Sequence, residues 1–379
     1  MTLFSRVRRR LGLVLAGAAL MPALVAVAQA QVPAATSVPK VIRIGVATGG
    51  VGTPPRTGGT TAGIANAQGL LEKEFEKDGI QVQWIFFKGA GPAVNEALVN
   101  RQLDLVWQGD LPSIVHRANG VKTRILLGNG VRTGLYLGVT PESGIQGIKD
   151  LKGKRIAVFK GTNLHLAAVR ALAAHGLKES DVKLINLDFA ASQAALTTKD
   201  IDGFFGYVQL FALRDKGLAK IVWSAAQDSY RFTRQTVLLG TDEFIEKHPQ
   251  AVQRVVDVLV RTTRQYSEES RRADLFEEWG KAEYPAAVWR EDFVGQPLRV
   301  RLSPLLDPFL VDIYKQAAKQ AHELKLVRSV PEIDSWFDRR FLDAALKSQG
   351  LVDYWPAYGA DGNLIGGGAG VPVVKPKGR

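Results

Sequence analysis

Short apolar runs alternate with longer stretches of helical spacing along this chain from Val41 onward. A first group extends from "VIRIGVA" to "TRILLGNG", and a second, similar group extends from "RIAVFK" to "AKIVWSA". Strand-like runs that alternate with helices of about ten or more residues are typical of a mostly parallel β-sheet covered by helices. We therefore expect an α/β protein with two lobes, each a mostly parallel sheet flanked by helices.

The pattern changes after the second group. The run "RQTVLLGT" predicts one return strand, and helical spacing then dominates as far as Gly350. We expect lobe 1 to comprise 40–132 and 234–350, and lobe 2 to comprise 133–233. The last segment, 351–379, is rich in Gly and Pro, and we expect a loosely ordered tail there.

The N-terminal segment, 1–30, differs from the rest of the chain. "MTLFSRVRRR" is basic, "LGLVLAGAALMPALVAVA" is apolar, and "AQA" before Gln31 fits a cleavage site. These features predict a cleavable signal peptide at 1–30 and a periplasmic protein. A retained membrane anchor is the alternative, but the apolar run has 18 residues and contains Pro22, and a spanning helix needs about 20 residues.

Length and composition narrow the function classes. The chain has 379 residues, more than the about 250 to 300 at which a single core stops growing, which supports two lobes. With no cysteine, disulfides and thiolate metal sites are excluded. The five histidines have no metal-binding spacing. We therefore expect no metal, no cofactor and no catalytic residues, and hence a protein that is not an enzyme.

The formal net charge is +12 at pH 7. The basic residues are scattered and interleaved with Asp and Glu, so the sequence predicts no nucleic-acid-binding stripe. A basic surplus of this kind would suit an anionic ligand.

Three loops follow predicted strands and lead into predicted helices. They are "ATGGVGTPPRTGGTT" at 47–61, "QGDLPS" at 108–113 and "KGTN" at 160–163. Ligands of open α/β sheets bind at such strand ends, and free N–H groups at a helix N-terminus favour an anion. "KGTN" does not match the phosphate-binding loop pattern, so the loops predict a cleft for an anion between the lobes and not a nucleotide site.

Four motifs carry a resemblance to a known family. They are "AGPAVNEAL" (90–98), "DLVWQGDLPSIV" (104–115), "DLKGKRIAVFKGTNLHLAAVRAL" (150–172) and "DIDGFFGYV" (200–208). In this order they resemble the periplasmic substrate-binding proteins of ABC importers for aliphatic sulfonates, taurine and nitrate. The resemblance covers about Val41 to Gly350 and implies the two-lobed type II periplasmic binding fold. It also implies a monomer that delivers a small organic or inorganic anion to an inner-membrane permease and its ATPase.

Carried over by position, the resemblance implies ligand-binding residues on both sides of the cleft. Gly109 and Asp110 belong to the lobe 1 side, where a helix cap is the alternative role of Asp110. The lobe 2 side is expected to hold the charged head group with free N–H groups and the Thr162 hydroxyl; alternatively, Thr162 only caps its helix. The residues of this side are Gly161, Thr162, Asn163 and His165, with core packing as the alternative role of the histidine.

Two features depart from the family pattern. Tyr207 and Gln209 stand where relatives usually carry a Trp and, two residues later, a Pro. The loop "GGVGTPPRTGG" is longer than the corresponding turn of sulfonate binders, and could close over a larger ligand or be a mobile insertion. We include Tyr207 and Gln209 among the ligand-binding candidates, together with Thr48 and Gly49 at the start of the loop. Packing in the core is the alternative role of Tyr207 and Gln209, as it is for Trp107.

Arg231 and Arg234, in "YRFTRQTVLLG", lie where the chain is expected to cross back to lobe 1. An arginine there could bind a sulfonate, nitrate or carboxylate through two parallel N–H···O bonds. A solvated charge at the hinge is the alternative. We assign Arg234 to the ligand and expect Arg231 to contribute little.

Two other functions fit parts of the pattern. A periplasmic ligand-sensing subunit would use the same cleft, and the sequence does not separate it from an importer subunit. An enzyme similar to the pyrimidine-precursor synthases would share the fold, but those proteins carry a cysteine-rich motif and no export signal.

Overall fold

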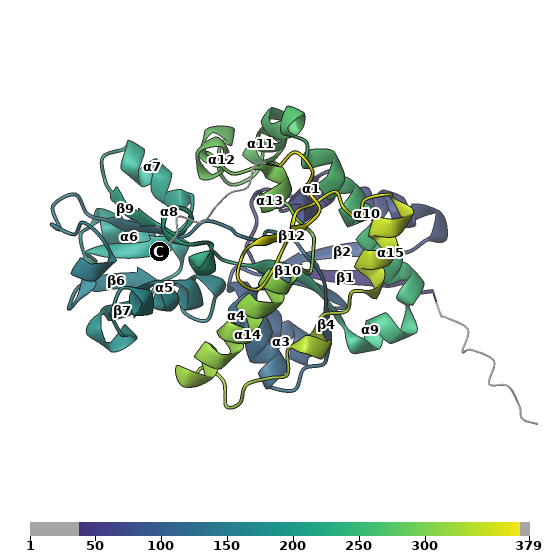
Figure 1. Cartoon of the computed structure of the whole chain (residues 1–379), viewed down its shortest axis with the longest axis horizontal. Helices are drawn as coiled ribbons and strands as arrows, with labels where there is room; N and C mark the ends of the chain where they lie inside the picture. The colour runs from purple at the N-terminus through teal and green to yellow at the C-terminus, as the bar shows by residue number, and fades with distance from the viewer. Residues whose placement is uncertain (1–37, 372–379) are drawn as a thin grey trace, which may run out of the picture. The chain divides into compact units, whose positions relative to one another are not determined.

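The computed structural model describes residues 38–371. The predicted signal peptide and the end of the predicted tail, 372–379, lie outside the described residues. Two five-stranded sheets dominate the described part of the chain, and both are flanked by helices (Figure 1). We call the part around the first sheet lobe 1 and the part around the second sheet lobe 2.

The lobe 1 sheet has the strand order β2-β1-β3-β10-β4. β1 pairs in parallel with β2 and β3, whereas β10 is antiparallel to both of its neighbours. Its strands are β1 (Val41–Val46), β2 (Gln81–Phe86), β3 (Leu105–Gly109), β4 (Thr123–Gly128) and β10 (Thr236–Thr241).

The lobe 2 sheet repeats this plan in the order β7-β6-β8-β5-β9. Here β5 is the antiparallel strand, and β6 pairs in parallel with β7 and β8. Its strands are β5 (Tyr136–Val139), β6 (Arg155–Val158), β7 (Lys183–Asn186), β8 (Gly203–Gly206) and β9 (Lys220–Ser224). The expectation of mostly parallel sheets is confirmed, with one antiparallel strand in each.

The helices fall into three groups along the chain. Those between the strands of lobe 1 are α1 (Thr61–Ala67), α2 (Leu70–Phe75), α3 (Ala90–Val99) and α4 (Asp110–Ala118). Those of lobe 2 are α5 (Asn163–Ala174), α6 (Phe189–Thr197), α7 (Gln209–Asp215) and α8 (Ala225–Asp228). After β10 come α9 (Asp242–Lys247), α10 (Pro249–Tyr266), α11 (Arg272–Gly280), α12 (Ala286–Asp292), α13 (Leu298–Arg301), α14 (Pro308–Glu323) and α15 (Arg340–Ser348).

The chain passes between the sheets twice, after β4 and before β10. At these crossings Thr133 and Arg234 pair as an antiparallel bridge, and each backbone N–H donates to the other residue's carbonyl at 3.0 Å. The bridge lies beside the expected boundaries of lobe 2. Arg234 therefore stands on the connection between the lobes.

The C-terminal helices contact both lobes. Trp279 of α11 and Phe293, just after α12, belong to one hydrophobic cluster with Ile64 of lobe 1 and Phe204 and Phe211 of lobe 2. This packing brings a segment far along the sequence to the place where the two lobes meet.

The expectation of a loosely ordered tail is wrong for Leu351–Val371. This segment contains β11 (Ala357–Tyr358) and β12 (Leu364–Gly366), which form a two-stranded sheet. Trp355 is fully buried, and its indole N–H donates to Ser267 Oγ at 3.1 Å. The Gly and Pro residues predict turns, but buried aromatic side chains between them anchor the segment.

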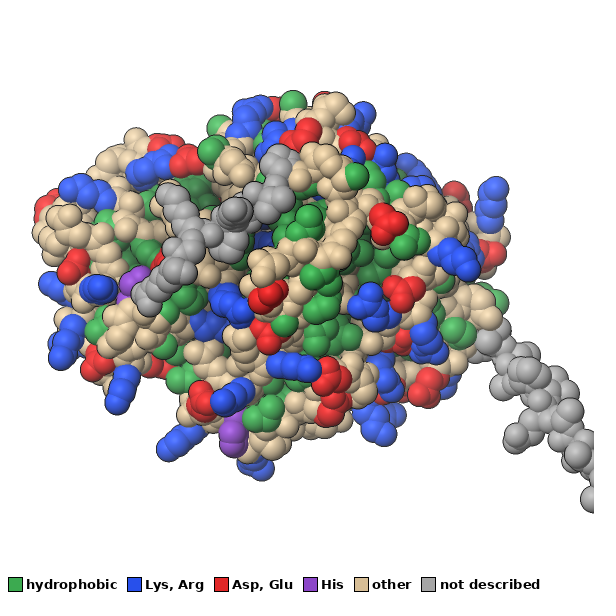
Figure 2. Space-filling view, viewed as in Figure 1, with side chains coloured by type: hydrophobic (Ala, Val, Ile, Leu, Met, Phe, Trp, Pro, Cys, Tyr) green, Lys and Arg blue, Asp and Glu red, His purple; other side chains and the backbone are tan. Residues whose placement is uncertain are grey.

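The surface agrees with the interleaved charges of the sequence. On the face drawn in Figure 2, basic and acidic side chains of the described residues are interspersed. Among residues 38–371, no helix combines the length and the apolar character needed to cross a bilayer.

Candidate functional site

A cavity of about 160 Å³ is lined by residues from both lobes and from the C-terminal helices. Lobe 1 contributes the ends of β1 and β3, and lobe 2 contributes the start of α5 and the segment after β8. The predicted residues that line it are Thr48, Gly109, Thr162, Asn163, Tyr207 and Arg234. The cavity lies at loops from two facing lobes, where the sequence predicts a cleft, and ligand binding by these residues stays a prediction.

Arg234 is a buried cation that has no counter-ion among residues 38–371. Its Nε donates to the carbonyl of Gly134 at 2.9 Å, and its guanidinium lies 4.9 Å from the ring centre of Tyr207. Its two terminal nitrogens have no hydrogen-bond or ion-pair partner among the described residues. Burial lowers the pKa of Arg234. A buried charge is unfavourable until it is paired. The two terminal nitrogens of Arg234 are therefore suited to bind an anion in the cavity.

A second charged group at the cavity is already neutralised. Asp292 Oδ2 accepts a hydrogen bond from Arg301 Nη2 at 2.7 Å, and Asp292 Oδ1 accepts one from the Tyr136 hydroxyl at 2.6 Å. Both side chains of the ion pair are almost fully buried. Of the described residues that line the cavity, Arg234 is therefore the one whose positive charge is unpaired.

The apolar wall is mainly aromatic. Phe189 at the start of α6, Tyr207 after β8 and Trp289 of α12 line the cavity, as does Trp107 of β3. The indole N–H of Trp107 donates to the carbonyl of Asn129 at 3.1 Å. In the described part of the chain, the cavity lining thus combines the unpaired cation of Arg234 with several aromatic rings.

The long Gly- and Pro-rich loop reaches the cavity with its C-terminal end. Val51 and Arg56 exchange two backbone hydrogen bonds of 2.9 Å, and the following residues, 57–60, line the cavity. A Cβ atom at Gly58 would lie 2.8 Å from Trp289 Cζ2, which is too close for any side chain. The structure therefore places part of this loop in the cavity wall against Trp289.

α5 begins with a side-chain cap. Thr162 Oγ1 accepts a hydrogen bond from the N–H of Leu164 at 3.3 Å and donates to the carbonyl of Phe159 at 2.7 Å. The capping alternative is thus what the structure shows, and the hydroxyl proton expected for the ligand already has an acceptor. Asn163 lines the cavity, whereas Gly161 does not.

α4 begins one residue earlier than expected. Gly109 is the N-cap and Asp110 is the first helical residue, so the prediction of Asp110 as the cap is wrong. The Asp110 carboxylate does not cap the helix from outside, because its Oδ1 accepts a hydrogen bond from the N–H of the next residue, Leu111, at 2.7 Å. Asp110 is fully buried and does not line the cavity. Burial raises its pKa to about 6, against the opposing effect of the positive charges of Arg170 and Arg234.

Three other candidates lie outside the cavity wall. Gly49 sits against Lys88, and His165 is buried with Nε2 3.5 Å from Glu179 Oε1. Burial lowers the pKa of His165, which favours the neutral ring. Gln209 is buried and does not line the cavity, and its Oε1 accepts a hydrogen bond from the N–H of Tyr207 at 2.9 Å. Gln209 therefore positions Tyr207 and is not itself part of the wall.

Sequence reasoning missed the contribution of the C-terminal helices. Trp289, Asp292 and Arg301 line the cavity, and so does Phe189 of lobe 2. Trp289 and Asp292 are three residues apart, so the spacing places them on one helix face. The spacing does not show what that face meets, and tertiary packing decides it.

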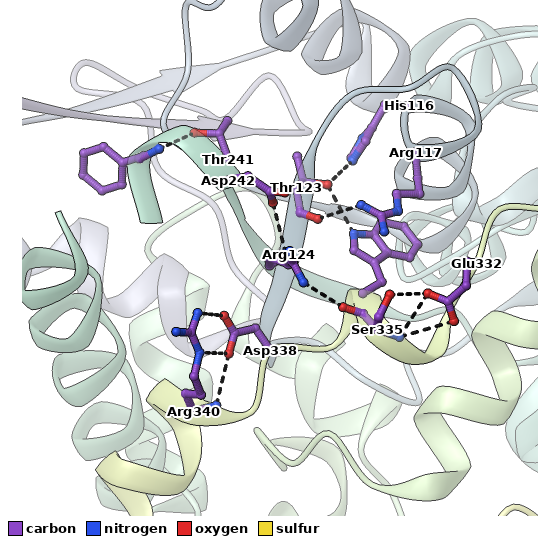
Figure 3. Close-up of polar contacts among 12 residues, drawn as sticks. His116, Arg117, Thr123, Arg124, Thr241, Asp242, Glu332, Ser335, Asp338 and Arg340 are labelled. Carbon is purple, nitrogen blue, oxygen red and sulfur yellow. Dashed lines mark hydrogen bonds and ion pairs between the residues drawn. The ribbon is translucent and has the colours of Figure 1, made fainter. Parts of the chain in front are cut away.

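A buried polar network extends from the end of β3. Gln108 Nε2 lies 2.9 Å from His116 Nδ1, and His116 Nε2 lies 2.8 Å from Thr123 Oγ1. Figure 3 shows His116 directed toward Thr123, beyond which Arg124 pairs with Asp242 at 3.2 Å. Burial lowers the pKa of His116 to about 3, so the ring is neutral. The network fixes a strand end that lines the cavity and supplies no titrating group to it.

No metal centre is evident in the described part of the chain. Among residues 38–371, no group of three or more His, Cys, Asp or Glu side chains could hold a metal ion.

Comparison with known proteins gives a family and a fold. Residues 64–273 match the model of a protein family described as NMT1/THI5 like. A protein of Bacillus subtilis (strain 168), named as an aliphatic sulfonates-binding protein, is 32% identical over 198 residues, or 52% of this chain and 58% of that protein. The chain thus spans about half the length of the curated relatives it matches.

Solved structures confirm the two-lobed α/β fold. The periplasmic sulfonate-binding protein SsuA from Methylobacillus flagellatus KT superposes with a TM-score of 0.74 at 28% identity. The match covers 85% of this chain and 98% of that one. The desulfurization enzyme DSZB matches with a TM-score of 0.61 at 16% identity, over 82% of this chain and 99% of that one, which is a likeness of fold alone. The family resemblance carried by the motifs is confirmed.

Proposed function

The chain belongs to the NMT1/THI5-like family, and on this premise we propose that it is the solute-binding subunit of an ABC importer. It takes up a small organic anion in the periplasm and delivers it to a membrane permease and its ATPase. The relatives that match at the sequence level are named binding proteins, which supports this role.

One observation carries the proposal. Arg234 lines the cavity, and its terminal nitrogens have no hydrogen-bond or ion-pair partner among the described residues, while Asp292 and Arg301 neutralise each other. An anionic group would restore the balance of charge, and a guanidinium matches the geometry of a sulfonate or carboxylate.

The position of Arg234 suits a protein that closes on its ligand. The residue stands on one of the two crossing segments, and the cavity walls come from both lobes. An anion bound there contacts the connection itself and both walls, so it binds the closed form more tightly than an open one. A ligand with that difference in affinity shifts the population toward closure.

The proposal assigns the protein no reaction of its own. The enzyme DSZB has the same fold at 16% identity, so the fold alone does not decide between binding and catalysis. The binding role is supported by the named relatives and by the charge of the cavity.

Thermal shift and isothermal titration calorimetry with sulfonates, taurine, nitrate and small carboxylates test the proposal. At least one anion should raise the melting temperature, by mass action. Arg234→Met should weaken its binding by about 2 to 5 kcal/mol, as expected for loss of a desolvated charge pair.

Arg231→Met is the matched control. Arg231 is half-buried in the same segment, and it is paired with Asp312 at 3.2 Å outside the cavity. Its replacement should leave affinity unchanged. Equal affinities of the parent and Arg234→Met, or a panel in which no anion binds, would contradict the proposal.

A further inference from the structure

A row of aromatic rings runs along the cavity from lobe 2 to the C-terminal helices. The rings of Phe189 and Tyr207 are 5.2 Å apart at 72°, and those of Tyr207 and Tyr284 are 5.8 Å apart at 88°. Tyr284 and Trp289 follow at 6.2 Å and 71°. These are edge-to-face contacts, the arrangement that aromatic pairs prefer. Phe189, Tyr207 and Trp289 line the cavity, so the row forms part of its wall.

The row is held in place before any ligand arrives. The indole N–H of Trp289 donates to the carbonyl of Tyr284 at 3.2 Å, and Gly58 and Gly59 pack directly against the indole ring. The backbone of Tyr207 is fixed by Gln209, and burial raises the pKa of the Tyr207 phenol, which therefore stays neutral. Rings that are already ordered lose little entropy when a ligand packs on them.

The unpaired charge lies beside this row. The guanidinium of Arg234 is 4.9 Å from the ring centre of Tyr207, so the cation and the aromatic wall meet at one residue. A ligand whose charged group contacts Arg234 therefore has its body beside the rings. A flat ring can join the row through edge-to-face or stacked contacts, whereas an alkyl chain gains only the burial of its surface.

We infer that the ligand of this cavity is an aromatic monoanion, with its ring packed among Phe189, Tyr207 and Trp289 and its anionic group on Arg234. The inference rests on the proposed function, because it names the ligand class of the same cavity. Aryl sulfonates and aryl carboxylates share this chemistry.

Isothermal titration of the purified protein with benzenesulfonate and cyclohexanesulfonate tests the inference. The two ligands carry the same charged group on rings of equal carbon number, and they differ in aromaticity. Benzenesulfonate should bind about tenfold more tightly, the upper range of what an aromatic contact adds beyond burial. Benzoate and cyclohexanecarboxylate repeat the comparison, and the tighter of the two aromatic ligands identifies the anionic group.

Variants of the aromatic residues then test whether these rings cause the preference for the aromatic ligand. Phe189→Leu and Trp289→Leu should each reduce the preference for the aromatic ligand to about twofold or less, because leucine keeps apolar bulk without a ring. Phe232→Leu is the control, since Phe232 is also a half-buried phenylalanine of lobe 2 and does not line the cavity. Trp289 is buried against Trp279, so Phe189→Leu carries the test if Trp289→Leu does not give a cooperative melt.

The outcomes separate the two proposals. If cyclohexanesulfonate binds as tightly as benzenesulfonate, the aromatic inference is overturned and the importer proposal stands. If the preference survives in Phe189→Leu, the row does not recognise the ligand and the inference is overturned as well. If no anion binds the parent, the proposed function itself fails.

Discussion

α4 and α5 begin at the same cavity in two different ways. α4 follows Gly109 without a side-chain cap and carries the buried carboxylate of Asp110 at its first position. α5 follows Thr162, whose hydroxyl caps the helix. β3 leads through Gly109 directly into α4, whereas the turn 159–162 joins β6 to α5. Among the described lining residues, the cation without a charged partner is Arg234, which stands on a crossing segment. A helix start near a cleft is therefore not by itself an anion site, because the neighbouring side chains decide its charge.

A carboxylate at the start of α5 should have the largest effect. In Thr162→Asp the aspartate can still cap the helix, but its charge lies at the cavity wall. Like charges brought together cost several kcal/mol, so the affinity for an anion should fall at least about a hundredfold. Calorimetric titration measures this, and Thr162→Asn, a neutral cap of similar size, should retain binding. Undiminished affinity in Thr162→Asp would place the anion away from this helix start.

Removal of the carboxylate from α4 should change stability with pH. Since burial raises the pKa of Asp110 from 3.8 to about 6, the folded protein binds a proton more tightly than the unfolded chain. This contribution to stability is complete below about pH 4 and is lost as the pH rises through 6. Asp110→Asn should therefore match the parent near pH 4 and be about 3 kcal/mol more stable near pH 7.5.

Urea unfolding at the two pH values checks the effect of Asp110. Asp353→Asn, a change at an exposed aspartate, should show no such difference. A constant difference between Asp110→Asn and the parent at both pH values would mean that Asp110 keeps an ordinary pKa in the folded protein.

A methyl group at the start of α4 should disturb closure. A Cβ atom at Gly109 would lie 2.7 Å from the side chain of Asn163, which stands at the start of α5. Overpacking of this kind costs about 1 to 3 kcal/mol, and separation of the lobes can relieve it. Gly109→Ala should therefore weaken ligand binding about tenfold or more with little loss of unfolding free energy. Gly147→Ala, at a glycine with open space around it, should bind normally.

Loss of the cap on α5 should have the smallest effect. Thr162→Ala removes the acceptor of the Leu164 N–H, which should lower the free energy of unfolding by about 1 kcal/mol. Chemical unfolding measures it, with Thr197→Ala at an exposed site as the control. An unchanged free energy in Thr162→Ala would show that the hydroxyl does not stabilise the helix start.

The sequence predicted the sheets because their strands are buried apolar runs between helices. Leu105 and Val106, for example, are buried side by side, which is what a central strand requires. The direction of β5 and β10 was not predictable in the same way. A central strand is buried on both faces whether it runs parallel or antiparallel to its neighbours. Its pattern of apolar residues therefore does not predict its direction.

The sequence predicted a cavity residue where its side-chain chemistry suits an anion and its place in the chain lies between the two lobes. The sequence predicts Arg234 as a ligand residue because an arginine at a chain crossing stands between two lobes. The structure places Arg234 in the cavity lining, and its contact with a ligand stays a prediction. His165 was wrongly included, since it lies two residues beyond Asn163 and the helix turns its side chain into the core. The sequence did not predict Trp289 and Asp292 as cavity residues. They belong to α12, and the sequence pattern does not show which part of the protein this helix packs against.

The place of β10 in the first sheet has a consequence for the order of folding during synthesis. β10 lies between β3 and β4, yet it begins at Thr236, after all five strands of the second sheet. A ribosome therefore completes all strands of the second sheet before it makes β10, the strand that joins β3 to β4 in the first sheet. Contacts between residues so far apart in sequence form slowly. We expect the second sheet to form first, and the first sheet to remain incomplete until β10 has emerged.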